Sequence, residues 1–450
     1  MDDRYAGNDG KAAHQWLPGL IVVVLAAVLL RIVIWQTYQP APVSDSQGYL
    51  QVANMFYTES FAKHYGARAP AYPLLLRHLG MTKYGMMEAP VRLFQAGLGV
   101  LMALLWYGLA WRQTRNRWFA LGIGLVSALI LSMAYFETLI MTEVVSAFLV
   151  VVFFWMAGLL GKRAPMTWID ALLLGFLVGL MALTRPIMLY LAPLLLVYLY
   201  LRWRDRPLRM RLWRIGLYLL PVLVMVLGWS WFNWRMTGYF SITTLAGFNL
   251  INHTGKFIEQ APPEYAEIAQ IYLRHRAERV AQAGNQSMTI WRAYDDLVGA
   301  TGLSYVGLSQ RLSELSGVLI RQHPWRYTLS VSQAWLGYWK VPIYWFPERI
   351  SYPVLADVQI ILWQIERYGL IAINMIFWIM GGYWMWLLWR GQAALSERRL
   401  AWLYLLVMAG AFAQALMDYG ENPRYGVPFQ MVIVWCVALG VYQAWQRWRT

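Results

Sequence analysis

The residues with the clearest chemical potential follow the first hydrophobic segment of the chain. Residues 43–76 are too polar to enter a bilayer, and an acid, Asp45, stands near their start. Ser44 and Gln47 have the spacing of a capping box, and aromatic and apolar residues then recur at helical spacing. Asp45 is therefore predicted in the first turn of an amphipathic helix along the membrane surface. Two interpretations stay open: the helix dipole simply favours an acid there, or it keeps a carboxylate ionised at the mouth of a cavity.

A stiff turn and three further charged segments accompany this acid. Residues 68–73 (RAPAYP) are expected to be rigid and extended, because each proline fixes its own φ and restricts its predecessor. Taken singly, the other segments carry ordinary interfacial charges. Four charged segments of alternating sign at one membrane face predict a polar cavity at the outer leaflet. The three further segments contain Glu137 and Glu143, then Arg185, then Asp418, Glu421, Arg424 and Tyr425.

Composition places these residues in a polytopic membrane protein. The chain is 59% hydrophobic and 16% aromatic, with a mean hydropathy of +0.41. The net charge of +15 does not indicate nucleic acid, because the basic residues gather between hydrophobic spans, as the positive-inside rule requires. The lone Cys436 excludes an intrachain disulfide. The polar start followed by an apolar run at 17–35 predicts a retained span rather than a cleaved signal peptide.

Ten spans are expected to position the charged segments. The apolar stretches 118–160 and 167–201 are each too long for one crossing of a ~30 Å core, so each is predicted to be a hairpin. Basic residues then fall on one side, including Lys162 and Arg163 between the hairpins, and both termini are cytoplasmic. The spans are 17–35, 90–111, 118–135, 142–160, 167–184, 186–201, 215–233, 369–389, 400–417 and 426–445.

The prediction is an all-α polytopic membrane protein with interfacial helices and a small extracytoplasmic α-helical domain. Its parts are residues 1–233 with a first outer loop at 36–89, the soluble segment 234–359, and residues 360–450. The Trp- and Tyr-rich stretch 325–346 is expected to be an interfacial helix, because counting it as a span would place Arg390, Arg398 and Arg399 outside. Arg31, which can snorkel outward, and Asp170 are assigned structural roles.

Motifs for other chemistries are not apparent. The sequence has no recognisable internal repeat, Walker-type glycine loop, HExxH, CxxC or Ser-His-Asp pattern. Its six histidines are scattered, and none pairs with a metal-ligand spacing.

Taken in order along nearly the whole chain, the motifs resemble those of the GT-C superfamily of membrane glycosyltransferases. The branch is that of bacterial enzymes similar to the aminoarabinose transferases of lipid A and the protein O-mannosyltransferases. Two motifs depart from that branch: Asp45-Ser46 stands where the mannosyltransferases have Asp-Glu, and Arg68-Ala-Pro where the aminoarabinose enzymes have a Glu-Lys-Pro-type turn. The chain also lacks their larger C-terminal soluble domain, so acceptor identity does not carry over. The matching motifs are SDSQGY with Asp45, RAPAYP, TE with Glu143, TRP with Arg185, and NPRYGVP with Arg424 and Tyr425.

The resemblance implies an inverting transferase that moves a sugar from a polyprenyl-phosphate donor to a lipid, glycan or protein acceptor. The active site would face the periplasm, in a multi-pass protein of the inner membrane. Asp45 would act as general base, and Glu143 would orient the acceptor, assist Asp45 or help hold an ion. Fixed arginines would stabilise the departing phosphate without a metal, and no cofactor is required. The donor-phosphate residues would be Arg185, Arg424, Arg68 and Tyr425, and the substrate cavity would include Tyr49, Tyr72, Glu137 and Glu421.

Two questions stay open from the sequence. A divalent cation on Asp45 and Glu143 is one alternative, because the outer acids supply two or three oxygen ligands. A carrier or flippase for lipid-linked sugars is the competing function, since it also needs a charged cavity. Alternating access places such a site near the midplane, however, whereas these charges gather at one face.

Overall fold

The computed structural model describes residues 9–40, 43–159, 167–342 and 344–449, and Lys162 and Arg163 fall outside them. Helices dominate the described residues, and two two-residue strands, β1 (Met81–Thr82) and β2 (Gly85–Met86), form a small antiparallel hairpin. The predicted all-helical class is confirmed. The α-helices are α1 (Asp9–Thr37), α2 (Ser44–Thr58), α3 (Ala71–Leu79), α4 (Glu88–Thr114), α5 (Arg117–Leu129), α6 (Leu131–Phe136), α7 (Glu143–Met156), α8 (Trp168–Thr184), α9 (Leu191–Arg202), α10 (Leu208–Thr237), α11 (Ala246–Thr254), α12 (Ala266–Ala283), α13 (Thr289–Thr301), α14 (Tyr305–Gln322), α15 (Pro324–Tyr338), α16 (Pro353–Trp389), α17 (Leu395–Met417), α18 (Asn422–Gly426) and α19 (Gln430–Arg449).

Short 3₁₀ turns link several of these helices. They are η1 (Pro186–Tyr190), η2 (Gly255–Gln260), η3 (Pro263–Tyr265), η4 (Pro347–Arg349) and η5 (Val427–Phe429). Prolines stand in the first turn of η1, η3, η4 and η5, where a missing N–H costs no hydrogen bond.

Apolar helices occupy every predicted span. Six stretches in the described residues are long and apolar enough to cross a membrane, and four shorter apolar helices lie at the remaining predicted spans. The structure thus supports six crossings by length, and the count of ten stays a prediction. The six are Trp16–Thr37, Glu88–Thr114, Leu208–Thr237, Pro353–Trp389, Leu395–Met417 and Asn422–Arg449. The four are Arg117–Leu129, Glu143–Met156, Trp168–Thr184 and Pro186–Arg202.

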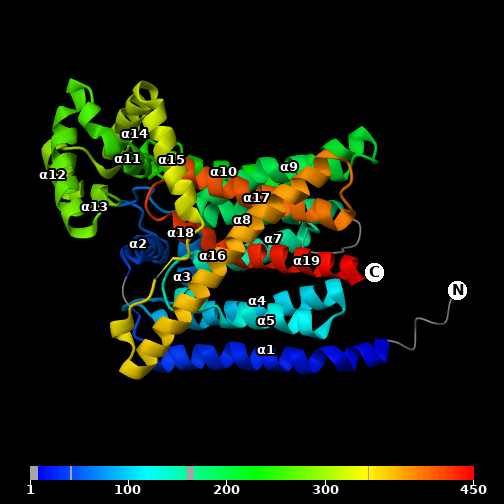
Figure 1. Ribbon diagram of the computed structural model, residues 1–450. Coiled ribbons are helices and arrows are strands. Elements are labelled where there is room, and N and C mark those ends of the chain that lie inside the picture. The colour runs from blue at the N-terminus through cyan, green and yellow to red at the C-terminus, as the bar shows by residue number, and fades with distance from the viewer. Residues whose placement is uncertain (1–8, 41–42, 160–166, 343, 450) are drawn as a thin grey trace.

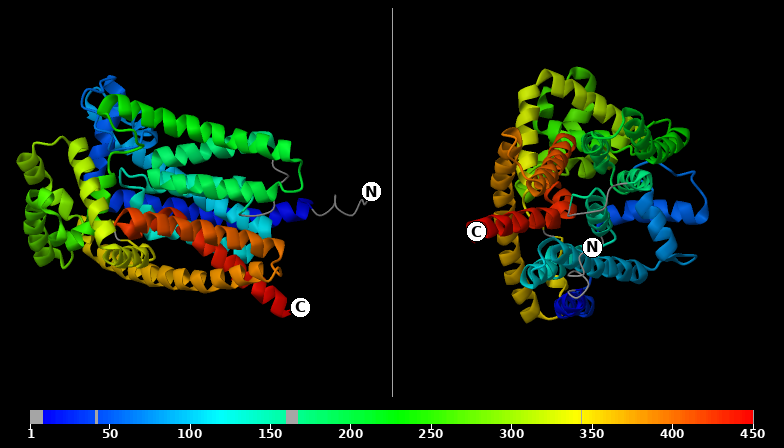
Figure 2. Two further views of the ribbon diagram at one scale, coloured as in Figure 1. Left: turned by 90° about the horizontal axis from the view of Figure 1, so that it is seen from above. Right: turned by 90° about the vertical axis from the view of Figure 1, so that its right-hand side faces the viewer.

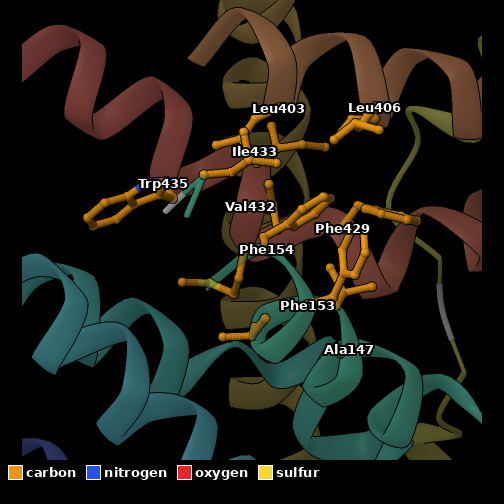
Figure 3. Close-up of a cluster of buried hydrophobic side chains, with 14 of the residues drawn as sticks. Ala147, Phe153, Phe154, Leu403, Leu406, Phe429, Val432, Ile433 and Trp435 are labelled. Atoms are coloured by element: carbon orange, nitrogen blue, oxygen red, sulfur yellow. The ribbon is translucent and has the colours of Figure 1, made fainter. Parts of the chain in front are cut away.

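The C-terminal helix lies at the centre of the bundle. In its apolar stretch 72% of residues are buried, against 17% in α1, which lies at the periphery. Large side chains of α7, including Phe153 and Phe154, pack there against Phe429 and Val432, with α17 above them (Figure 3). Elsewhere a glycine allows close packing: a Cβ on Gly175 of α8 would collide with the carbonyl oxygen of Tyr218 in α10.

Helices α11–α15, here called the helical cap, form one end of the molecule. Figure 1 shows the cap and α2 at the end opposite the start of α1 and the C-terminus, and Figure 2 shows the same separation from a second direction. The loops joining α4 to α5, α9 to α10 and α16 to α17 lie at the terminal end (Figure 1). Buried side chains give the cap its own core, among them Phe248, Tyr272, Leu297 and Leu312.

The predicted edges of the soluble segment fall inside continuous helices. Helix α10 runs on to Thr237 and α16 begins at Pro353, so neither 233 nor 359 is a structural boundary. Residues 325–346 were expected to form one interfacial helix, but the helix found there, α15, ends at Tyr338. This helix packs against protein: the Trp335 ring stacks on Trp378 of α16 at a centroid distance of 4.9 Å.

We expect the cap to be extracytoplasmic, because the described basic loops, those joining α4 to α5, α9 to α10 and α16 to α17, lie at the other end. Single-cysteine variants test this: Gln270→Cys on α12 should react with an impermeant thiol reagent in intact cells, and Gln392→Cys between α16 and α17 should not. Both positions are exposed, whereas the native Cys436 is buried and contributes little background. Labelling at 392 without labelling at 270 would invert the proposed orientation.

Contrary to the prediction, Arg31 does not snorkel outward. Its Nη2 donates to Glu137 Oε1 at 2.5 Å, and its Nη1 donates to the carbonyl oxygens of Ala27 and Ala128. The pair occupies the space left by Gly99 on α4, where a Cβ would collide with both side chains. Asp170 keeps its predicted structural role, because it forms a capping box with Thr167 at the start of α8.

This pair supports a stability prediction. Arg31→Met should destabilise the protein by about 3–5 kcal/mol, because it leaves the Glu137 carboxylate buried without a partner. The double variant Arg31→Met, Glu137→Met should recover most of that loss. Thermal unfolding of the purified proteins in detergent measures both. Equal losses of stability in the single and double variants would show that Arg31 stabilises the protein by something other than its ion pair with Glu137.

Candidate active site

Helix α2 presents Asp45 from its first turn, as predicted. Val43, rather than Ser44, takes the N-cap position, and the Ser44 side chain of the expected capping box lies outside the described part. Ser46 donates to the carbonyl oxygen of Ile140 at 3.0 Å, which fixes the start of α2 against the tip of the first hairpin. Asp45 is therefore held by a helix end tied to another part of the bundle.

Arg68 approaches Asp45 from the turn that precedes α3. Its Nη2 donates to Asp45 Oδ1 at 2.7 Å, and its guanidinium lies 4.7 Å from the centre of the Tyr49 ring. Gly48 permits this approach, since a Cβ there would lie 2.7 Å from Arg68 Nε. The RAPAYP turn ends in α3, so it is partly helical rather than extended throughout.

Arg424 joins Asp45 to Glu143. From α18 its Nη1 donates to Asp45 Oδ2 at 2.5 Å, and its Nε donates to Glu143 Oε1. Arg185 completes the row, with Nη2 3.4 Å from the same Glu143 oxygen. The five side chains alternate in sign: Arg68, Asp45, Arg424, Glu143, Arg185. Residues more than 370 positions apart in the chain thus form one ionic network.

The network is mostly buried. Glu143 is fully buried, the side chains of Arg424 and Arg185 are 7% and 6% exposed, and Asp45 is 27% exposed. One oxygen of Glu143 and one Nη of Arg185 have no hydrogen-bond partner in the described residues. Arg185 also lies over the Tyr425 ring, 4.6 Å from its centre. The arginines are thus held in position by their partners, and an N–H group of Arg185 remains available to a ligand.

Two guanidinium groups keep Asp45 ionised. Burial alone would raise its pKa, but the charges of Arg424 and Arg68 and their hydrogen bonds outweigh burial and hold the pKa of Asp45 well below its usual value. The interpretation of Asp45 as an ionised carboxylate at a cavity is thus supported by partners other than the helix dipole. By contrast, burial raises the pKa of Asp418, which precedes α18, to about 6.

A cavity of about 660 Å³ opens beside this network. This volume is within the range of about 300–1,000 Å³ typical of small-molecule sites. Its charged wall contains Asp45, Arg68, Arg185 and Arg424, and its apolar wall comes from η1, α9 and α17. The loop before α11 and α11 itself also line it. The combination suits an amphiphile with an anionic head.

Not every predicted cavity residue reaches this wall. Tyr49 and Tyr425 line it, but Tyr72 does not; its hydroxyl donates to Gln95 Oε1 at 2.8 Å. Glu137 turns to Arg31, and Glu421 lies behind Arg424, accepting a hydrogen bond from Tyr344. These three side chains were placed by their position in outer segments, which does not determine the direction they face.

Among the polar residues of the wall that sequence reasoning missed are two amides, Gln414 and Asn249. A signal was available for Gln414, because an amide inside an otherwise apolar span is costly unless it has a polar partner or faces a cavity.

The carboxylates are arranged for arginine rather than for a metal. In the described ranges no group of three or more His, Cys, Asp and Glu side chains could hold a metal ion. Asp45 and Glu143, the two ligands considered from the sequence, both accept hydrogen bonds from Arg424. A divalent ion would have to displace that guanidinium, so no step is assigned to one.

No protein-family model and no curated protein sequence matches this chain. Two solved structures of the oligosaccharyltransferase of Archaeoglobus fulgidus, one with an inhibitory peptide and a dolichol-phosphate and one tethered to an acceptor peptide, resemble it distantly. Both have 14% identity and a TM-score of 0.44, and they cover 96% and 94% of this chain. The chain spans about half the length of those proteins (51% and 49%). A likeness at this level assigns neither a family nor an activity.

Proposed function

We propose that the protein is an inverting glycosyltransferase that moves a sugar from a polyprenyl-phosphate donor to an extracytoplasmic acceptor. The observation that carries the proposal is the position of Asp45 on a cavity wall between two guanidinium groups. Such a wall combines a carboxylate for the acceptor proton with fixed cations for a phosphate.

In this reaction the acceptor oxygen attacks the anomeric carbon while the bond from that carbon to the phosphate oxygen breaks. The acceptor proton passes to Asp45, and the polyprenyl phosphate leaves with the bonding electron pair. Arg424 and Arg185 offset the charge that develops on the departing phosphate, and Arg68 shares this role. Attack from the face opposite the leaving group inverts the anomeric configuration.

The low pKa of Asp45 implies that binding of the donor must first raise the basicity of this carboxylate. A carboxylate bound by two arginines is a weak proton acceptor, because both partners favour its ionised form. When a phosphate takes hydrogen bonds from Arg424 and Arg68, those partners are shared and the basicity of Asp45 rises. Donor binding would thus precede effective proton removal.

A carrier for lipid-linked sugars is the alternative. The cavity, however, is built partly from η1 and the end of α17 and partly from residues 241–249, which lead into the cap and include the start of α11. It therefore lies at one end of the bundle, whereas alternating access expects a site near the midplane. This position favours an enzyme.

A transfer assay separates the two functions. Purified protein in detergent micelles is incubated with a polyprenyl-phosphate sugar labelled in the sugar, together with glycan, lipid and peptide acceptors. A detergent micelle does not separate two compartments, so a carrier would leave the labelled donor chemically unchanged. The enzyme should consume the donor and release polyprenyl phosphate with time. Unchanged donor with every acceptor, from protein that still binds it, would favour the carrier.

A further inference from the structure

Two amide side chains line the cavity wall without a hydrogen-bond partner among the residues that the structure describes. Gln414 on α17 is 3% exposed, and Asn249 lies on α11. Neither amide makes a hydrogen bond to another residue in the part of the chain that the structure describes. Two other buried amides, Gln95 and Asn233, each donate to two backbone carbonyls. Since buried polar groups are normally paired, the free amide of the buried Gln414 points to a ligand, and the partly exposed amide of Asn249 lines the same cavity.

The charges around the cavity indicate what these amides do not bind. Asp45 is the only acidic residue among the described residues of the wall, and Arg68 and Arg424 already occupy its two oxygens. Glu143, behind the wall, is bound by Arg424. Among the described residues of the wall no carboxylate is therefore free to pair with an ammonium group; the unpaired oxygen of Glu143 is fully buried behind the wall, and three arginines of the wall would repel such a group.

An amide offers both donors and acceptors, which matches a hydroxyl group that also does both. From these observations we infer that Gln414 and Asn249 form a subsite for the hydroxyl groups of an uncharged sugar. The inference rests on the proposed function and adds the class of sugar: neutral and hydroxylated rather than an amino sugar. The arginines bind the phosphate of the donor, and the two amides hold its sugar from α17 and from α11.

The test compares matched donors that differ by one group: polyprenyl-phosphate glucose with glucosamine, galactose with galactosamine, and mannose with mannosamine. The readout is the ratio of kcat/KM for the neutral sugar to that for its amino counterpart. The wild type should prefer the neutral member of the pair it uses best. Gln414→Leu should lower kcat/KM for that sugar about tenfold, because a hydroxyl loses its buried partner.

A charge-changing variant sharpens the test. Gln414→Glu supplies a carboxylate without adding volume, and it should shift the ratio about tenfold toward the amino sugar. Gln270→Glu, at an exposed position of α12, is the matched control and should leave the ratio unchanged. Asn249→Leu provides a second loss of an amide, from the less buried side of the subsite. Thermal unfolding checks that each variant is folded.

Three results would overturn the inference. They are a wild type that prefers amino sugars, a ratio that neither Gln414 variant moves, and losses that are equal for both members of a pair in every variant. Failure of the wild type to transfer from any donor is a different result, because it contradicts the proposed function itself.

Discussion

Replacing Asp45 by Asn is expected to lower the rate of sugar transfer by about 10²–10⁴-fold, the usual contribution of a general base. Asparagine keeps the size of the side chain but cannot take the acceptor proton. Donor binding should survive, since Arg68 and Arg424 lose the carboxylate they now share and remain free for phosphate. Single-turnover kinetics and equilibrium donor binding, measured on the same purified protein, separate these effects.

The matched control is Asp295→Asn, at an exposed position of α13 in the cap, which should transfer at the wild-type rate. A rate for Asp45→Asn within a few-fold of wild type would exclude Asp45 as the base. Loss of donor binding together with rate would instead assign Asp45 a role in building the site.

The second large effect is expected at Arg424. Its guanidinium bonds Asp45 through Nη1 and Glu143 through Nε, and lysine cannot make two such contacts in fixed directions. The charge on the leaving phosphate grows only as the glycosidic bond breaks, so a contact made there raises turnover more than binding. Arg424→Lys should keep donor affinity near wild type and cut the single-turnover rate at least about tenfold, which is about 1.4 kcal/mol.

Arg274→Lys serves as the control, because Arg274 forms an exposed pair with Asp296 in the cap, far along the chain from the network. Exposed pairs contribute little, so this variant should behave as wild type. An unchanged single-turnover rate in Arg424→Lys would leave Arg424 as an anchor of α18 and shift the leaving-group role to Arg185.

Sequence periodicity and charge predicted much of the fold. Apolar runs long enough to be helices produced helices at every expected span, because hydrophobicity over about 20 residues is a strong signal. The ends of helices were less predictable. Residues 353–359 were assigned to the soluble segment, yet they begin α16, which is one helix of 37 residues.

The charged residues illustrate a second limit. Asp45, Arg68, Glu143, Arg185 and Arg424 were grouped by their place in outer segments, and the structure brings them together. The same logic grouped Glu137 with them, although it pairs with Arg31, 106 positions away in the sequence. Position in a segment predicts the membrane depth of a side chain but not its direction. Direction depends on packing, here on the space that Gly99 leaves.

The most direct test of the central claim is the anomeric configuration of the first product. NMR of sugar transferred by the purified protein from a polyprenyl-phosphate donor of known configuration would show the outcome of the bond change. If Asp45 acts as a base and the arginines support the leaving phosphate, the product should have the inverted configuration. Retention, with the sugar trapped on Asp45 as a covalent intermediate, would make Asp45 a nucleophile and contradict the account.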